Sequence, residues 1–273
     1  MKVGSNFAFG RLNNVTQTYQ ESATKEGIGL KTLILLSTTL ITSLVFINVA
    51  LRINYMPIYT YIIAGVIAFI LNLIMVLSPL KAKYLSIPYA ISEGLIIGCI
   101  CELLELVLPG MGLRIASLAL LVTLSVFVGG AFLYMKGIIK VGQKFKAMLF
   151  SFSIGIIVFS LCFGIMGVSK EFVPLFYGAG YEKCISLFLT TGVNLYSIYY
   201  FSGLGIIGSI IMCIVATLYV IVSFDNATQI VDSGADKDYE WYASYAITLN
   251  VIYLFFEILR LILIILSNSS KRK

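Results

Sequence analysis

The sequence predicts an all-α fold, a polytopic membrane bundle of about seven transmembrane helices. Hydrophobic residues make up 59% of the 273 positions, charged residues only 12%, and the mean hydropathy is +0.98. A soluble domain carries roughly 25% charged residues, because its surface must be wet. With half that share of charged residues, the chain has too little polar surface for a globular protein in water. Lipid is therefore the solvent for most of this chain.

Seven apolar stretches are each long enough to cross a hydrocarbon layer of ~30 Å, which takes about 20 helical residues. They cover residues 32–51, 57–77, 87–108, 113–135, 146–168, 203–224 and 243–266. Pro57 opens the second stretch at a favourable helix start, and Pro109-Gly110 closes the third. Each stretch is predicted to be α-helical, because a single segment in lipid satisfies its own backbone only as a helix.

These spans form one domain over residues 29–267. A polar segment, residues 1–28, precedes the domain, and a basic tail, residues 268–273, follows it. The polar segment has no apolar core of the kind that a cleavable signal needs, so we expect the first span to be retained.

Basic residues predict that the N-terminus is cytoplasmic. In that orientation the first five spans place ten basic residues inside and four outside, and cytoplasmic loops carry such an excess. Ile- and Lys-rich usage with a short tail favours a bacterial plasma membrane protein. An eighth span over residues 184–201 would return the basic tail to the cytoplasm, but this segment holds only 18 residues, several of them polar. We therefore favour seven spans.

The composition also limits the chemistry. Histidine, the usual general base and zinc ligand, is absent. Cys99 and Cys101 would lie about 200° apart on a helix, and we interpret the five cysteines as buried hydrophobes. Residues 203–208 match the dinucleotide fingerprint but open a membrane span, so these glycines, like Gly94 and Gly98, are interpreted as helix-packing positions. We expect no enzymatic activity, no cofactor and no nucleic-acid partner.

Acidic residues within spans are the candidate functional groups, because burying a charge in lipid is costly. Glu93 lies about two turns inside the third span, and Asp225 ends the sixth. The structural alternatives are that Glu93 pairs with Lys81 or Lys83 and that Asp225 is a solvated helix end. For the acids near the outer end of the third span, residues 102 and 105, we favour a water-exposed rim.

The last span adds Asn250, Glu257 and Arg260. The first two are seven residues apart and share a face, while the last two are three apart and can pair. At 1.5 Å per residue, Asn250 lies roughly 13 Å in from the preceding aromatic belt, and Glu93 about 9 Å in from the same side. Asp225 is expected at the cytoplasmic entrance to the region that contains Glu93 and Asn250. These three oxygen-bearing side chains are expected to converge, which suits a hard cation such as Ca²⁺.

Two stretches carry a family resemblance. Residues 224–243, FDNATQIVDSGADKDYEWYA, and residues 254–260, LFFEILR, resemble the bacterial branch of the Bax inhibitor-1-like membrane proteins. Residues 5–11, SNFAFGR, and 88–94, PYAISEG, add weaker support. The resemblance implies a seven-helix bundle in which a central last helix is wrapped by six others.

The resemblance also implies a pH-sensitive Ca²⁺ leak, in which two aspartates share a proton and latch the cytoplasmic side of the pathway. The first falls on Asp225, or on Ser223 after a shift of two residues. The second falls on Asn250, which cannot titrate. Because of this departure, the resemblance implies the pH latch less strongly for this chain. It is still compatible with passage of Ca²⁺.

The expected function is therefore a cation pathway, a Ca²⁺ leak channel. Asp225 and Glu93 would attract Ca²⁺ and hold it transiently, Asn250 would offer a neutral carbonyl ligand, and Glu257 with Arg260 would form an internal gate or brace. The alternative is a non-conducting regulatory protein that binds membrane proteases or stress-response partners. The expected partners are the lipid bilayer, Ca²⁺ and other membrane proteins.

The orientation yields a first testable prediction. Reporter fusions after Lys83 and after Lys146 should both give cytoplasmic signals, because both sites follow an even number of spans. A fusion at Lys273 should report the outer side. A cytoplasmic signal at Lys273 would contradict seven spans and favour eight.

Overall fold

The computed structural model describes residues 22–270 apart from 54–57, 137, 139–140 and 167–202. Within these residues the chain forms seven α-helices and one short 3₁₀ helix, which confirms the all-α bundle. They are α1 (Lys25–Ile53), α2 (Ile58–Leu77), η2 (Pro79–Lys81), α3 (Ala82–Val107), α4 (Gly112–Met135), α5 (Gln143–Met166), α9 (Gly203–Asp232) and α10 (Tyr239–Ser270). The alternative span at 184–201 lies outside the described residues.

Five of these helices are long and apolar enough to cross a membrane. Their apolar stretches are Lys25–Ala50, Tyr59–Leu77, Gly112–Met135, Gly208–Asp232 and Tyr239–Leu266. Of the other two, α3 carries three glutamates, and α5 has two lysines in its first turn followed by an uncharged, apolar run. The chain is thus a multi-pass membrane protein.

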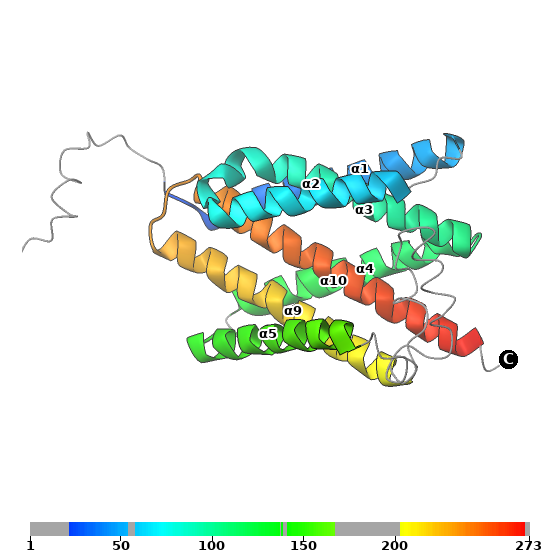
Figure 1. The fold of residues 1–273 in the computed structure, drawn as a ribbon. Helices are drawn as coiled ribbons and strands as arrows, with labels where there is room; N and C mark the ends of the chain where they lie inside the picture. Colours follow the sequence, from blue (N-terminus) through cyan, green and yellow to red (C-terminus); the bar gives the residue numbers. More distant parts are fainter. Residues whose placement is uncertain (1–21, 54–57, 137, 139–140, 167–202, 271–273) are drawn as a thin grey trace, which may run out of the picture.

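The last helix, α10, lies at the centre of the bundle (Figure 1). Half of its apolar stretch is buried, against 17 to 33% in the other four membrane-length helices. It packs against α1, α3, α4 and α9. The expectation of a central last helix is confirmed.

Glycines allow α1 and α3 to approach closely, as the sequence predicted. A Cβ at Gly94 would lie 2.6 Å from the Thr39 carbonyl oxygen, and one at Gly98 would lie 3.1 Å from that of Ser43. A larger side chain at Gly94 would force the two helices apart, and one at Gly98 would require the neighbouring atoms to shift. At Gly208, by contrast, a Cβ would meet no described atom within 4 Å, so the packing role predicted for that glycine is not seen.

One end of the bundle carries most of the lysines, and we call it the basic end. It is formed by the start of α1, the α2–α3 and α4–α5 connections and the α9–α10 turn, and its lysines are Lys25, Lys31, Lys81, Lys83, Lys136, Lys144, Lys146 and Lys237. The chain before α1 is held to the α9–α10 turn here, because the Ala23 N–H donates to the Ala235 carbonyl at 2.8 Å.

A buried ion pair joins α1 to α10 at the basic end. Glu240 is 1% exposed, and its carboxylate accepts from Lys31 Nζ at 2.5 Å. It also accepts from Thr24, through the backbone N–H at 2.7 Å and the hydroxyl at 3.0 Å. The Lys31 ammonium lies 5.2 Å from the centre of the Trp241 ring. Glu240 is therefore fully partnered, which is the condition for a buried charge to be tolerated.

A second ion pair nearby offers a contrast. Lys83 and Asp238 are 2.9 Å apart, but both side chains are more than 40% exposed. The hydrogen bond and the charge of Asp238 raise the pKa of Lys83. Exposed pairs of this kind contribute little to stability, because water and salt screen them.

The two pairs give a matched stability prediction. Glu240→Ala should lower the free energy of unfolding by about 3 to 5 kcal/mol, because it leaves the Lys31 charge uncompensated. Asp238→Ala should leave the unfolding midpoint nearly unchanged. Both are measured by denaturant unfolding of the purified protein in the same detergent. Equal effects of the two substitutions would show that the buried pair does not anchor α1.

Candidate functional site

A cavity of about 470 Å³ lies beside α10, and we call it the polar cavity. It is bounded by α2, α3, α9 and α10, and its polar lining residues are Asn72, Tyr89, Glu93, Tyr219, Asn250 and Tyr253. Five apolar side chains of α9 and α10 complete the wall. Two of the predicted site residues, Glu93 and Asn250, are thereby brought together.

Glu93 is held by aromatic neighbours. Tyr89, one turn earlier on α3, hydrogen-bonds with the Glu93 carboxyl group. The rings of Tyr89 and Tyr245 meet edge to face at 5.1 Å, and the Tyr245 hydroxyl donates to Asn72 Oδ1 at 2.5 Å. Glu93 is thus linked to α2 and α10, whereas Lys83, one of its predicted alternative partners, pairs with Asp238.

Asn250 connects α10 to α9. Its Nδ2 donates to the backbone carbonyl of Tyr219 at 3.5 Å. The Tyr219 hydroxyl in turn donates to the Leu149 carbonyl of α5, also at 3.5 Å. The amide therefore lies at a contact between two membrane-length helices, and the Glu93 carboxylate of α3 lines the same cavity.

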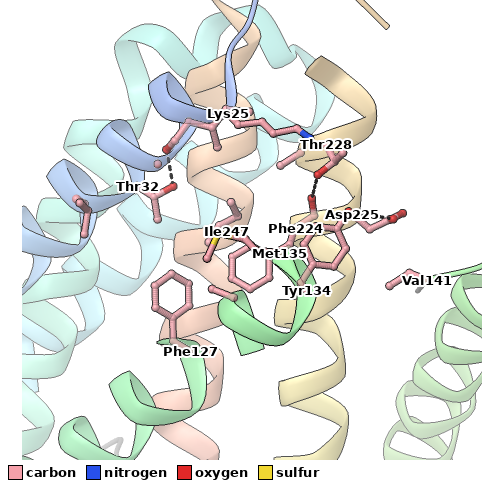
Figure 2. Close-up of a pocket in the computed structure, with 15 residues that line it drawn as sticks. Lys25, Thr32, Phe127, Tyr134, Met135, Val141, Phe224, Asp225, Thr228 and Ile247 are labelled. Carbon is pink, nitrogen blue, oxygen red and sulfur yellow. Dashed lines mark hydrogen bonds between the residues drawn. The ribbon is translucent and has the colours of Figure 1, made fainter. Parts of the chain in front are cut away.

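Asp225 does not line the polar cavity. It lies six residues beyond Tyr219, about 9 Å further along α9 toward the basic end. Its carboxylate accepts from Lys146 at 2.5 Å, from Gln229 at 2.8 Å and from the Tyr134 hydroxyl at 3.3 Å. Asp225 therefore joins α4 and α5 to α9, and it contributes to a second cavity at the basic end (Figure 2).

Glu257 and Arg260 continue the polar groups toward the far end of α10. Glu257 is 7% exposed, and its Oε2 lies 3.8 Å from Arg260 Nη1, so the predicted pairing is present at long range. Tyr253, which lines the polar cavity, also hydrogen-bonds with Glu257. A row of polar side chains thus runs along the central helix from the polar cavity to this pair.

The two acids near the far end of α3 behave differently from each other. Glu105 accepts from the backbone N–H groups of Gly110 at 2.6 Å and Leu113 at 2.9 Å, so it stabilises the turn that starts α4. Glu102 is only 3% exposed, and its Oε2 has no hydrogen-bond partner among the described residues. The water-exposed rim predicted for this pair is therefore wrong for Glu102, which faces the bundle interior.

Sequence reasoning missed the tyrosines of the site. A usable signal was present, since Tyr89 precedes Glu93 and Tyr253 precedes Glu257 by four residues in each case. Residues four apart lie one above the other on a helix, so each tyrosine was placed to reach its carboxylate. Across the part of the chain that the structure describes, no three His, Cys, Asp or Glu side chains are grouped to hold a metal ion.

Comparison with known proteins supplies one match. A protein family described as Bax inhibitor 1 like matches residues 6–267, nearly the whole chain. Comparison with curated proteins and with solved structures finds no match.

Proposed function

This chain belongs to the Bax inhibitor 1 like family, and we propose that it provides a leak pathway for Ca²⁺ through the polar cavity. The observation that supports the proposal is the juxtaposition of Glu93 and Asn250 beside the central helix. A carboxylate inside a membrane bundle is retained at a cost in free energy, and such residues typically mark ion or proton routes.

The lining chemistry suits passage of a hard cation better than its storage. Carboxylate and amide oxygens are ligands that Ca²⁺ prefers, and the described lining residues include neither histidine nor cysteine. A resident Ca²⁺ site takes six to eight oxygens, usually with several carboxylates. Among the described residues that line this cavity Glu93 is the single carboxylate, so we propose brief occupancy during transit.

Asp225 and the Glu257–Arg260 pair have separate places in this proposal. Asp225 stands nearer the basic end, where it would attract Ca²⁺ once its ion pair with Lys146 opens. Glu257 and Arg260 lie beyond Tyr253 at the other end of the cavity, where their pairing would brace or gate the exit. Because Asp225 is engaged by three donors, its role depends on movement of α5, which carries Lys146.

Liposome flux tests the proposal directly. Vesicles that contain the protein and a trapped Ca²⁺ indicator should take up Ca²⁺ faster than empty vesicles. Glu93→Gln should slow the initial rate by about tenfold, the equivalent of a loss of about 1.4 kcal/mol of attraction for the ion. Glu26→Gln, an exposed acid of the first turn of α1, is the matched control and should have no effect.

The same assay examines Asp225. If this carboxylate attracts the ion, Asp225→Asn should slow the flux and Lys146→Gln should speed it, because the second change frees the carboxylate. Equal effects of both changes would instead assign the pair a purely structural role. A protein that is correctly oriented but leaks no more than empty vesicles would favour the non-conducting regulatory function.

A change at Asn250 should create a pH response. Asn250→Asp would place a second carboxylate in the cavity with Glu93, and two such groups in a poorly solvated site share a proton. Flux of the variant should rise between about pH 6 and 8 as that proton leaves, while flux of the unmodified protein varies less.

Double variants identify the partner of the introduced aspartate. Adding Glu93→Gln should abolish the new pH dependence, and adding Asp225→Asn should leave it unchanged, because Asp225 lines a different cavity. The reverse result would place residue 250 against Asp225 and contradict the geometry described above.

A further inference from the structure

A second cavity lies at the basic end between α1, α4, α9 and α10, and we call it the basic-end cavity (Figure 2). Its volume is about 800 Å³. The interior is apolar and includes Ile28, Phe127, Phe224 and Ile247. A pocket of this size holds a substantial ligand, and its walls offer such a ligand mainly hydrophobic contact.

The polar groups of this cavity are satisfied internally. The Thr32 and Thr228 hydroxyls donate to the carbonyls of Ile28 and Phe224 at 2.8 and 3.0 Å. The Tyr134 hydroxyl donates to Asp225, whose charge is balanced by Lys146. These groups therefore make no strong demand on a ligand.

Lys25 is the exception. It is exposed, and its side chain has no ion-pair or hydrogen-bond partner among the residues that the structure describes. Figure 2 shows its side chain extending across the top of the cavity toward Thr228. Among the lining residues Lys25 and Asp225 carry charge, and because Lys146 balances Asp225, the lining itself is left with the positive charge of Lys25. Asp232, which acts on Tyr134, lies one turn beyond Thr228 and outside the lining. A complementary ligand has an anionic group at the mouth and an apolar body inside.

The cavity reaches the membrane between α1 and α4. These helices pack against α3 and α10 rather than against each other. Lys25, Gly29 and Leu33 follow one face of α1 at intervals of four residues, and a Cβ at Gly29 would meet nothing within 4 Å. Leu33 and Met135, on the two sides of this gap, are 59% and 77% exposed. An acyl chain can enter sideways from the lipid.

From these observations we propose that the basic-end cavity binds one anionic phospholipid, with an acyl chain inside and its phosphate at Lys25. Lipid supplies both required parts, since the leaflet at this end presents phosphate at the depth of Lys25 and acyl chains at the depth of Leu33. Basic residues at a membrane surface attract anionic lipids in this way. This site is distinct from the polar cavity, although Asp225, to which the proposed Ca²⁺ route assigns attraction of the ion, also lines it.

Native mass spectrometry of the delipidated full chain, with phosphatidylglycerol or phosphatidylcholine added, tests the proposal. One phosphatidylglycerol should be retained in preference to phosphatidylcholine. Lys25→Gln should weaken its retention about fivefold, the contribution of one basic residue at a membrane surface. Lys81→Gln, at the same end but outside the cavity, should not. Gly29→Leu should fill the gap and displace the lipid, whereas Gly129→Leu, an equally open position on α4 outside the cavity lining, should not.

A second measurement requires no substitution and so does not depend on how the variants fold. Phosphatidylglycerol with a photoreactive acyl chain should label α1 and α4 around Leu33 and Phe127. Equal retention of both lipids with labelling scattered over the bundle would overturn the proposal. Tighter binding of a free fatty acid would also overturn it, as would lipid binding that appears only after residues 1–21 are removed.

Discussion

Polar side chains on α10 must be kept away from lipid, and the arrangement of the bundle follows from this requirement. Glu240, Asn250, Glu257 and Arg260 occupy successive levels of one membrane-length helix. A hydrocarbon solvent cannot hydrogen-bond with such groups, so a lipid-facing position would cost several kcal/mol for each. Placing α10 in the centre lets the start of α1 supply partners for Glu240 and lets α9 supply one for Asn250, while Glu257 and Arg260 pair with each other on α10. The polar cavity lies beside the same helix.

The two cavities share α9 and α10 but differ in chemistry. The polar cavity lies between these helices and the α2–α3 side, with a carboxylate on its wall. The basic-end cavity lies between the same helices and the α1–α4 side, and its interior is apolar. Asp225 stands close to both regions without lining the first. Movement of α9 against α10 would alter both cavities together, so occupancy of one is expected to influence the other.

The depth of each polar residue along its helix could be predicted from the sequence. The residues of other helices that surround it could not. A rise of 1.5 Å per residue placed Glu93 and Asn250 at similar depths, and they do share a cavity. The same arithmetic placed Asp225 correctly near the basic end. It could not show that Lys146 of α5 would occupy that carboxylate, because the angular position of one helix around another depends on packing. Glycine spacing was informative at Gly94 and Gly98 because contacts there are made by the backbone itself.

The buried pair between α1 and α10 has a spectroscopic consequence. Trp241 is the single tryptophan of the chain, and it lies beneath the Lys31 ammonium at the joint between the two helices. Indole emission therefore comes from one place, and a nearby cation changes its wavelength and intensity. Detachment of the first turns of α1 would remove that cation and admit water. The protein carries its own fluorescent reporter of whether this joint is closed, and no label has to be introduced.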